Sequence, residues 1–92
     1  MKKELEKIFK ALGNSKRLEI ISLLSKNKRL SVGEIAYEIS LSFRSVSKHL
    51  AVLTKAGITE NSRGGMSVYY EVARSARHPL REFLRIVCKE CR

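Results

Sequence analysis

The segment SVGEIAYEISLSFRSVSKHLAVLTKAG, residues 31–57, decides the fold. It opens with Ser31 and, three residues later, Glu34, which is the spacing of a capping box at a helix N-terminus. Apolar residues then recur at helical spacing in two groups: Ile35, Ala36 and Ile39, followed by Val46, Leu50 and Leu53. Residues 40–42 separate the groups, Ser42 is expected to cap the second helix, and Gly57 ends it. The segment therefore predicts two short helices joined by a tight turn, which is a helix-turn-helix.

Two further helices are predicted before this segment. Leu5, Ile8, Phe9 and Leu12 follow the spacing of one helical face up to Gly13, where we expect the glycine to end the helix. Asn14 or Ser15 then caps a second helix, which is apolar on more than one side and so is expected to be buried.

A β-hairpin and a last helix are predicted after Gly57. Val68, Tyr70 and Val72 alternate with polar residues, and Arg63-Gly64-Gly65 supplies the turn. Pro79 stands where the first residue of a helix would be, so the last helix is expected over about 79–91. The whole pattern predicts one mainly α domain over 1–92, a winged helix of about five helices with its wing at about 58–72.

The charge balance points to a polyanionic partner. Nineteen Lys and Arg face nine acids, all of them Glu, which gives a formal net charge of +10 on 92 residues. Such an excess is typical of proteins that bind nucleic acid or an anionic membrane surface. The basic residues are not collected on one amphipathic helix, which disfavours a membrane surface as the partner.

No apolar run approaches the roughly 20 residues of a membrane span, and the N-terminus lacks the features of a signal peptide, so we expect a cytoplasmic location.

The second helix of the helix-turn-helix has a basic, acid-free outer face suited to the DNA major groove. Arginine and lysine donate to guanine O6 and N7 or to phosphates, and serine serves either. We expect Phe43 to cover the turn rather than contact a thymine methyl, and His49 to be a partly buried helix residue or a phosphate donor rather than a metal ligand. The candidate DNA contacts are Ser42, Phe43, Arg44, Ser45, Ser47, Lys48, His49 and, at the hairpin tip, Arg63.

Residues 5 to about 74 resemble the ArsR-type winged-helix transcription repressors. The similarity is carried by ALGNSKRLEIISLL, GEIAYEISLSFRSVSKHLAVLTKAGI and SRGGMSVYYEV. It implies a symmetric dimer that binds an operator in double-stranded DNA and releases it on a signal. It also implies that the first and last helices form the dimer interface, which agrees with the apolar stripes there. The implied interface residues are Leu5, Ile8, Phe9, Leu80, Phe83, Leu84 and Val87.

The implied signal is the point where this chain departs from the family. Arsenic-sensing members carry cysteines in the first helix of the helix-turn-helix, and zinc-sensing members carry Asp and His pairs on the last helix. Here residues 32–39 contain no cysteine, and the chain contains no Asp. The remaining candidate is Cys88 with Cys91, a C-x-x-C pair.

Three interpretations of this cysteine pair stay open. It supplies two of the four ligands of tetrahedral zinc, so a dimer could hold zinc or another thiophilic metal, although no cofactor is required. It could form a redox switch if its thiol pKa values are lowered. It could also be two small apolar residues on the dimer stripe.

Other classes of function fit the residues less well. A winged helix can bind protein or RNA without an operator, but RNA-specific proteins stack bases on exposed aromatics, which are few here. A thiol oxidoreductase places its cysteine pair at a helix start in a βαβ unit. The sequence shows no such unit and no catalytic constellation, so we expect no enzymatic activity.

Overall fold

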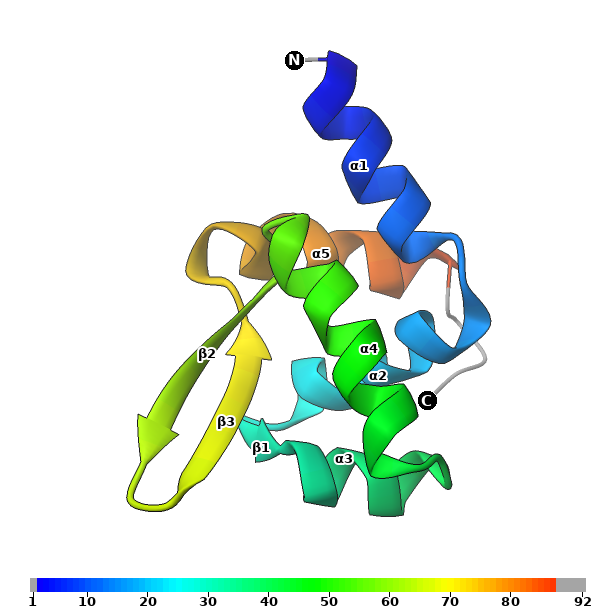
Figure 1. Cartoon of the computed structure of the whole chain (residues 1–92). Helices are drawn as coiled ribbons and strands as arrows, with labels where there is room; N and C mark the ends of the chain where they lie inside the picture. The colour runs from blue at the N-terminus through cyan, green and yellow to red at the C-terminus, as the bar shows by residue number, and fades with distance from the viewer. Residues whose placement is uncertain (1, 88–92) are drawn as a thin grey trace.

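The computed structural model describes residues 2–87, apart from the side chains at positions 2, 84, 86 and 87 (Figure 1). Over this range it confirms the predicted mainly α winged helix, with five helices and one small antiparallel sheet. In chain order the elements are α1 Lys2–Leu12, α2 Ser15–Lys26, β1 Leu30–Ser31, α3 Val32–Ile39, α4 Phe43–Lys55, β2 Thr59–Gly64, β3 Ser67–Val72 and α5 Arg74–Val87.

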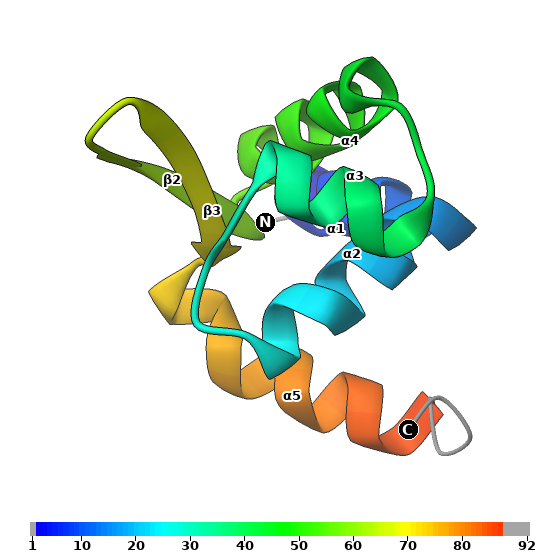
Figure 2. The same cartoon turned by 90° about the horizontal axis from the view of Figure 1, so that it is seen from below.

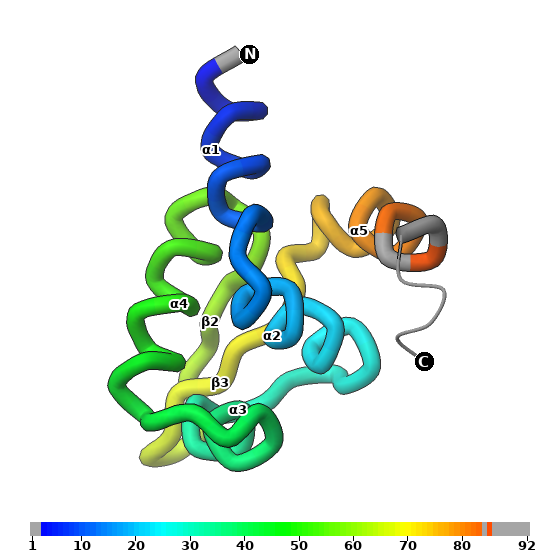
Figure 3. Tube along the Cα trace, turned by 90° about the vertical axis from the view of Figure 1, so that its right-hand side faces the viewer, coloured from blue at the N-terminus to red at the C-terminus, as the bar shows by residue number. Residues whose placement is uncertain are grey.

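Helix α2 lies at the centre of the core. It contacts all the other helices as well as β3, as its apolar residues on several sides predicted. The views in Figures 2 and 3 place α4 and α5 on opposite sides of α2. The largest fully buried side chains are Ile20, Ile21, Leu24, Ile35, Val46, Leu50 and Leu53. The apolar spacing of residues 31–57 therefore predicted the core positions of α3 and α4 correctly.

Local hydrogen bonds fix both ends of the helix-turn-helix. The predicted capping box is present: the Glu34 N–H donates to Ser31 Oγ (3.1 Å), and the Ser31 N–H donates to Glu34 Oε1 (2.8 Å). At the end of α4, the Ile58 N–H bonds the Leu53 carbonyl and the Gly57 N–H bonds the Thr54 carbonyl, both at 3.0 Å. These two bonds form a Schellman motif, which needs the left-handed Gly57 (φ 81°).

The wing differs from the predicted hairpin in two respects. The turn is shifted toward the C-terminus, because Gly64 still pairs with Ser67 and only Gly65 and Met66 form the loop. Of the glycine pair only Gly65 has a positive φ (65°), as the first loop residue of a II′ turn requires. The sheet also has a third strand, since β1 pairs with β3 to give the order β1-β3-β2. Only two residues long, β1 is too short to show an alternating pattern in the sequence.

Helix α5 begins at Arg74, five residues before the predicted start at Pro79. Pro79 is the sixth residue of this helix and has no N–H, so the helix lacks the bond that position 79 would make to the Ser75 carbonyl. Ala76 packs on the core from this added stretch and Leu80 packs on it directly after Pro79, and this packing offsets that loss. Helix α1 ends at Leu12 as expected, but Gly13 does not take a positive φ. Within residues 2–87, no helix combines the length and apolar character needed to cross a membrane.

Candidate nucleic-acid interface

Helix α4 presents the predicted basic face to solvent. Arg44 and Lys48 are exposed on the side of α4 opposite its buried stripe, which consists of Val46, Leu50 and Leu53. Ser45 and Ser47 are half-buried between these two sides. The helix contains no acidic residue, so nothing on it would repel a phosphate. Figure 1 shows α4 (green) lying across the face of the molecule turned to the viewer. The arrangement gives a convex, positively charged helix that can enter a major groove.

The start of α4 is closed by serine hydroxyls. The Ser45 N–H donates to Ser42 Oγ (3.0 Å), and the Ser42 hydroxyl donates to Ser45 Oγ (3.1 Å). Ser42 is thus the N-cap that the sequence predicted. Its contact with a phosphate stays a prediction, which the exposed helix N-terminus favours.

Phe43 does not cover the turn, contrary to our expectation. Its side chain is 64% exposed and lies outside the apolar core cluster. Leu41 packs against that cluster instead, so the turn is covered without Phe43. The exposed ring stands beside Arg44 at the start of the helix, where it favours the alternative of an apolar contact with DNA.

His49 is turned toward Arg17 of α2, as a partly buried helix residue. Arg17 Nη1 lies 3.3 Å from His49 Nδ1, so the guanidinium donates and the imidazole nitrogen accepts. Burial and, to a lesser degree, the charge of Arg17 lower the pKa of His49. The structure therefore favours a neutral imidazole over a phosphate donor.

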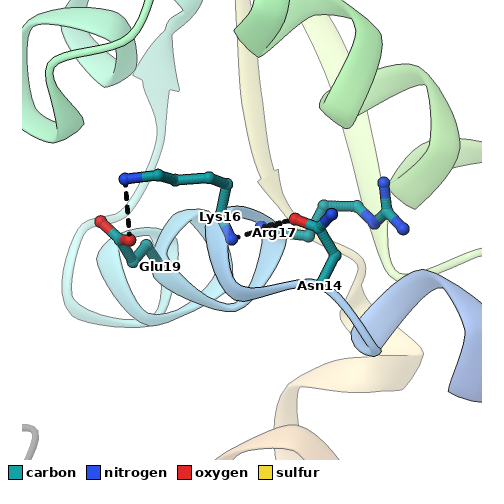
Figure 4. A network of polar contacts seen from close by, with 4 residues as sticks. All are labelled: Asn14, Lys16, Arg17 and Glu19. Carbon is teal, nitrogen blue, oxygen red and sulfur yellow. Dashed lines mark hydrogen bonds and ion pairs between the residues drawn. The ribbon is translucent and has the colours of Figure 1, made fainter.

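Arg17 is the residue of this region that the sequence did not reveal. Besides the His49 contact, its Nε donates to the Ala11 carbonyl (2.6 Å) and its Nη2 donates to the Lys10 carbonyl (3.3 Å). It thus joins the C-terminus of α1 to the middle of α4. Its backbone N–H and that of Lys16 bond the side chain of Asn14, the cap of α2 (Figure 4). An arginine in a helix is too common for its spacing to signal this role.

The wing extends the same side of the molecule as α4. Figures 2 and 3 agree that the hairpin tip and α4 lie on one side, away from α5. Arg63 is exposed near this tip, where it pairs with Val68 across the hairpin. Met66, in the loop itself, is fully exposed. Arg63 is therefore on the same side as α4, and its contact with DNA stays a prediction.

An apolar groove lies between α1, the end of α4 and the start of α5. Ile8, Phe9, Ile58, Pro79 and Phe83 are among its lining residues. Of the predicted dimer contacts, Leu5, Phe9 and Phe83 are exposed and Ile8 is half-buried, whereas Leu80 is buried in the core at 7% exposure. The side chains of Leu84 and Val87 lie outside the described part of the chain.

The candidate sensor residues Cys88 and Cys91 lie outside the described residues. Among residues 2–87, no three His, Cys, Asp or Glu side chains come together in a way that could hold a metal ion.

Comparison with known proteins matches this geometry to one family. The family model described as bacterial regulatory protein, arsR family, matches residues 14–60, just over half of the 92-residue chain. The transcriptional activator HlyU of Vibrio cholerae is 32% identical over 83 residues, covering 89% of this chain and 76% of HlyU. The transcriptional repressor SdpR of Bacillus subtilis is 34% identical over 65 residues, which cover 71% of each chain.

Solved structures agree with these sequence matches. The structure of Vibrio cholerae HlyU gives a TM-score of 0.83 at 28% identity, with 95% of each chain covered. The homodimeric winged helix-turn-helix DNA-binding domain of Mb0332 from Mycobacterium bovis gives 0.85 at 28% identity, covering 96% of this chain and 81% of that one. The chain therefore belongs to the arsR family of bacterial regulatory proteins and is a DNA-binding transcriptional regulator, not an enzyme.

Proposed function

We propose that this regulator is a symmetric dimer that represses transcription by binding a pseudo-palindromic operator through two copies of α4. The observation that carries the proposal is the exposed, acid-free face of α4 around Arg44 and Lys48, held by a fully buried stripe. In a symmetric dimer the two helices enter successive major grooves, about 34–36 Å apart. The cytoplasmic location stays a prediction. It agrees with the proposed function, because a bacterial chromosome lies in the cytoplasm.

Exposed apolar residues on α1 and α5 support dimerisation. Helix α1 projects beyond the rest of the molecule (Figures 1 and 3), and Phe9 on it is 65% exposed. Phe83 of α5 and Phe9 line the same groove. A second copy that covers this groove would bury both rings, and removing this apolar surface from water would stabilise the dimer. The homodimeric relative Mb0332 has the same fold.

Repression is favoured over activation because it needs only occupancy of the operator. The helix-turn-helix and wing supply that occupancy by themselves. The relatives are named for both activation and repression, since HlyU is called an activator and SdpR a repressor. Transcription in vitro from a promoter that overlaps the selected operator should therefore fall when the protein is added. A rise would make the protein an activator.

The binding experiment uses an operator selected from a random duplex library and measures fluorescence anisotropy. The double variant Arg44→Ala/Lys48→Ala should weaken operator binding by about 1–3 kcal/mol for each bidentate hydrogen-bond pair to a base that it removes. Lys26→Ala/Lys28→Ala is the matched control, because it removes the same charge from the groove between α2 and α5. Equal binding by the wild type and the Arg44/Lys48 variant would exclude the assigned face. No preference for any operator over random duplex would favour a module that contacts protein or RNA.

Cys88 and Cys91 are our candidate sensor, either as a thiol pair oxidised to a disulfide or as ligands for zinc. The pair has the spacing that both chemistries use. Operator affinity should change on addition of a thiol oxidant or of zinc, and the Cys88→Ser/Cys91→Ser variant should not respond. A response that persists in this variant would exclude the pair as sensor, and no response in the wild type would leave the cysteines as packing residues.

A further inference from the structure

A cation is held over an aromatic ring on the outer face of the wing. Arg29, just before β1, places its guanidinium carbon 4.4 Å from the centroid of the Tyr69 ring. Tyr70 packs against the core, so the ring of Tyr69 points to the other face of the sheet. The negative face of the ring attracts the guanidinium and restrains it at one place.

Gly64 makes room for this stack. A Cβ atom at position 64 would lie 2.9 Å from Cε2 of Tyr69 and 3.6 Å from Nη2 of Arg29. The first distance is shorter than a side chain can tolerate, so the ring reaches the backbone of β2 only because residue 64 is glycine. Gly64 is also the last residue of β2. The Arg29 guanidinium therefore lies next to the hairpin turn, although Arg29 itself belongs to the base of the wing.

The charge of Arg29 is oriented but not neutralised. Within residues 2–87, no carboxylate forms an ion pair with Arg29, and its guanidinium donates no hydrogen bond. Glu71, the acid on the same face of β3, is paired with Arg77 at 3.6 Å. A guanidinium with its donors unused and its position restrained is suited to bidentate contact with a phosphate.

The position of the stack fits DNA bound to α4. The hairpin tip and α4 lie on the same side of the molecule, as Figure 2 shows. Lys28, the neighbour of Arg29, lines the groove beside α5 on the opposite side. The two adjacent cations are therefore directed to different faces.

We propose that Arg29 contacts a backbone phosphate of the bound duplex, and that Tyr69 and Gly64 are the positioning residues that hold it at the wing tip. The inference rests on the proposed DNA-binding function. It assigns to the wing a cation from outside the hairpin, in addition to Arg63. A phosphate contact carries no base information, so Arg29 would add affinity and orientation rather than sequence preference.

The test measures anisotropy with a random-sequence duplex of about 30 base pairs, from about 50 to about 200 mM salt. Arg29→Ala should weaken binding about fivefold and reduce the slope of log affinity against log salt by about 0.9 for each phosphate that is no longer neutralised. Lys28→Ala removes the same charge from the next residue and should leave both quantities near those of the wild type. Thermal melts of each variant check that the fold is retained.

Variants of Tyr69 test the positioning role. Tyr69→Phe keeps the ring and should bind like the wild type, whereas Tyr69→Leu should weaken binding. The Arg29→Ala/Tyr69→Leu double variant should bind no more weakly than Arg29→Ala, because the two residues act through one contact.

The outcomes separate the inference from the function on which it rests. If the wild type binds no duplex at all, the proposed function fails and the inference fails with it. If the wild type binds but Arg29→Ala keeps the wild-type affinity and salt slope, only the inference is overturned. The same holds if Lys28→Ala weakens binding as much as Arg29→Ala, because the effect is then one of net charge.

Discussion

At the scale of single residues, neighbouring side chains decide the surroundings of two residues on α4. Phe43 is exposed because Leu41 already covers the turn, and the pKa of His49 is lowered by burial and, to a lesser degree, by the charge of Arg17. Ser40, in the same turn, adopts a left-handed conformation (φ 57°) that a serine rarely takes. The chain tolerates this conformation because the Leu41 N–H bonds the Ala36 carbonyl at 3.1 Å.

The lowered pKa of His49 predicts loss of stability on acidification. The folded state binds the imidazole proton less tightly than the unfolded chain, whose histidine has a pKa of about 6.5. The stabilisation is therefore present above that value and lost as the pH falls through the lower pKa of the folded state. Thermal midpoints measured near pH 7.5 and near pH 5 should fall more for the wild type than for His49→Gln. Equal falls in the two proteins would contradict the prediction.

At the scale of elements, the wing depends on close approach between strands as well as on its turn. Gly65 takes the positive φ that the turn requires. Gly64 has a different role, because its missing side chain leaves the space that the Tyr69 ring occupies. The third strand β1 then ties the wing to the helix-turn-helix, since Ser31 pairs with Tyr69 and also caps α3. A two-stranded hairpin alone would be marginal, and these contacts stabilise it.

Gly64→Ala should destabilise the protein by about 1 kcal/mol, because the new methyl group collides with the Tyr69 ring. Urea unfolding measures the loss. In a Tyr69→Ala background the same substitution should cost almost nothing, since the colliding ring is absent. An equal cost in both backgrounds would show that the glycine is needed for its backbone and not for the ring.

At the scale of the whole molecule, the two proposed functional surfaces lie apart. The basic face of α4 and the wing tip occupy one side, and the apolar groove of α1 and α5 lies away from the exposed side of α4. A second copy can therefore cover the groove without blocking the DNA-binding face. In that arrangement dimerisation sets the spacing of the two α4 helices, so loss of the dimer should also weaken operator binding.

Phe9→Glu should convert the dimer to a monomer at micromolar concentration, because it places a charge where an exposed ring would be buried. Sedimentation velocity measures the change. Tyr37→Glu is the matched control, since Tyr37 is an aromatic residue 84% exposed on α3, outside the groove. A Phe9→Glu protein that stays dimeric would exclude this groove as the interface.

The sequence by itself determined the features that arise from short-range physics. Caps such as Ser31 and Ser42 bond N–H groups three residues away, and the apolar spacing of α3 and α4 reports a single buried face. The exposed Arg44 and Lys48 followed from the same periodicity. These features could be predicted because each depends on residues within one or two helical turns.

Only the tertiary structure decided the rest. Helix α5 extends back past Pro79 because Ala76 packs on the core, and β1 forms because β3 lies beside it. The Arg17–His49 contact spans 32 residues of sequence, and the Arg29–Tyr69 stack spans 40. No local pattern encodes such pairs, since they exist only after packing has brought the elements together. Packing can also outweigh the local preference of a proline or of a two-residue strand.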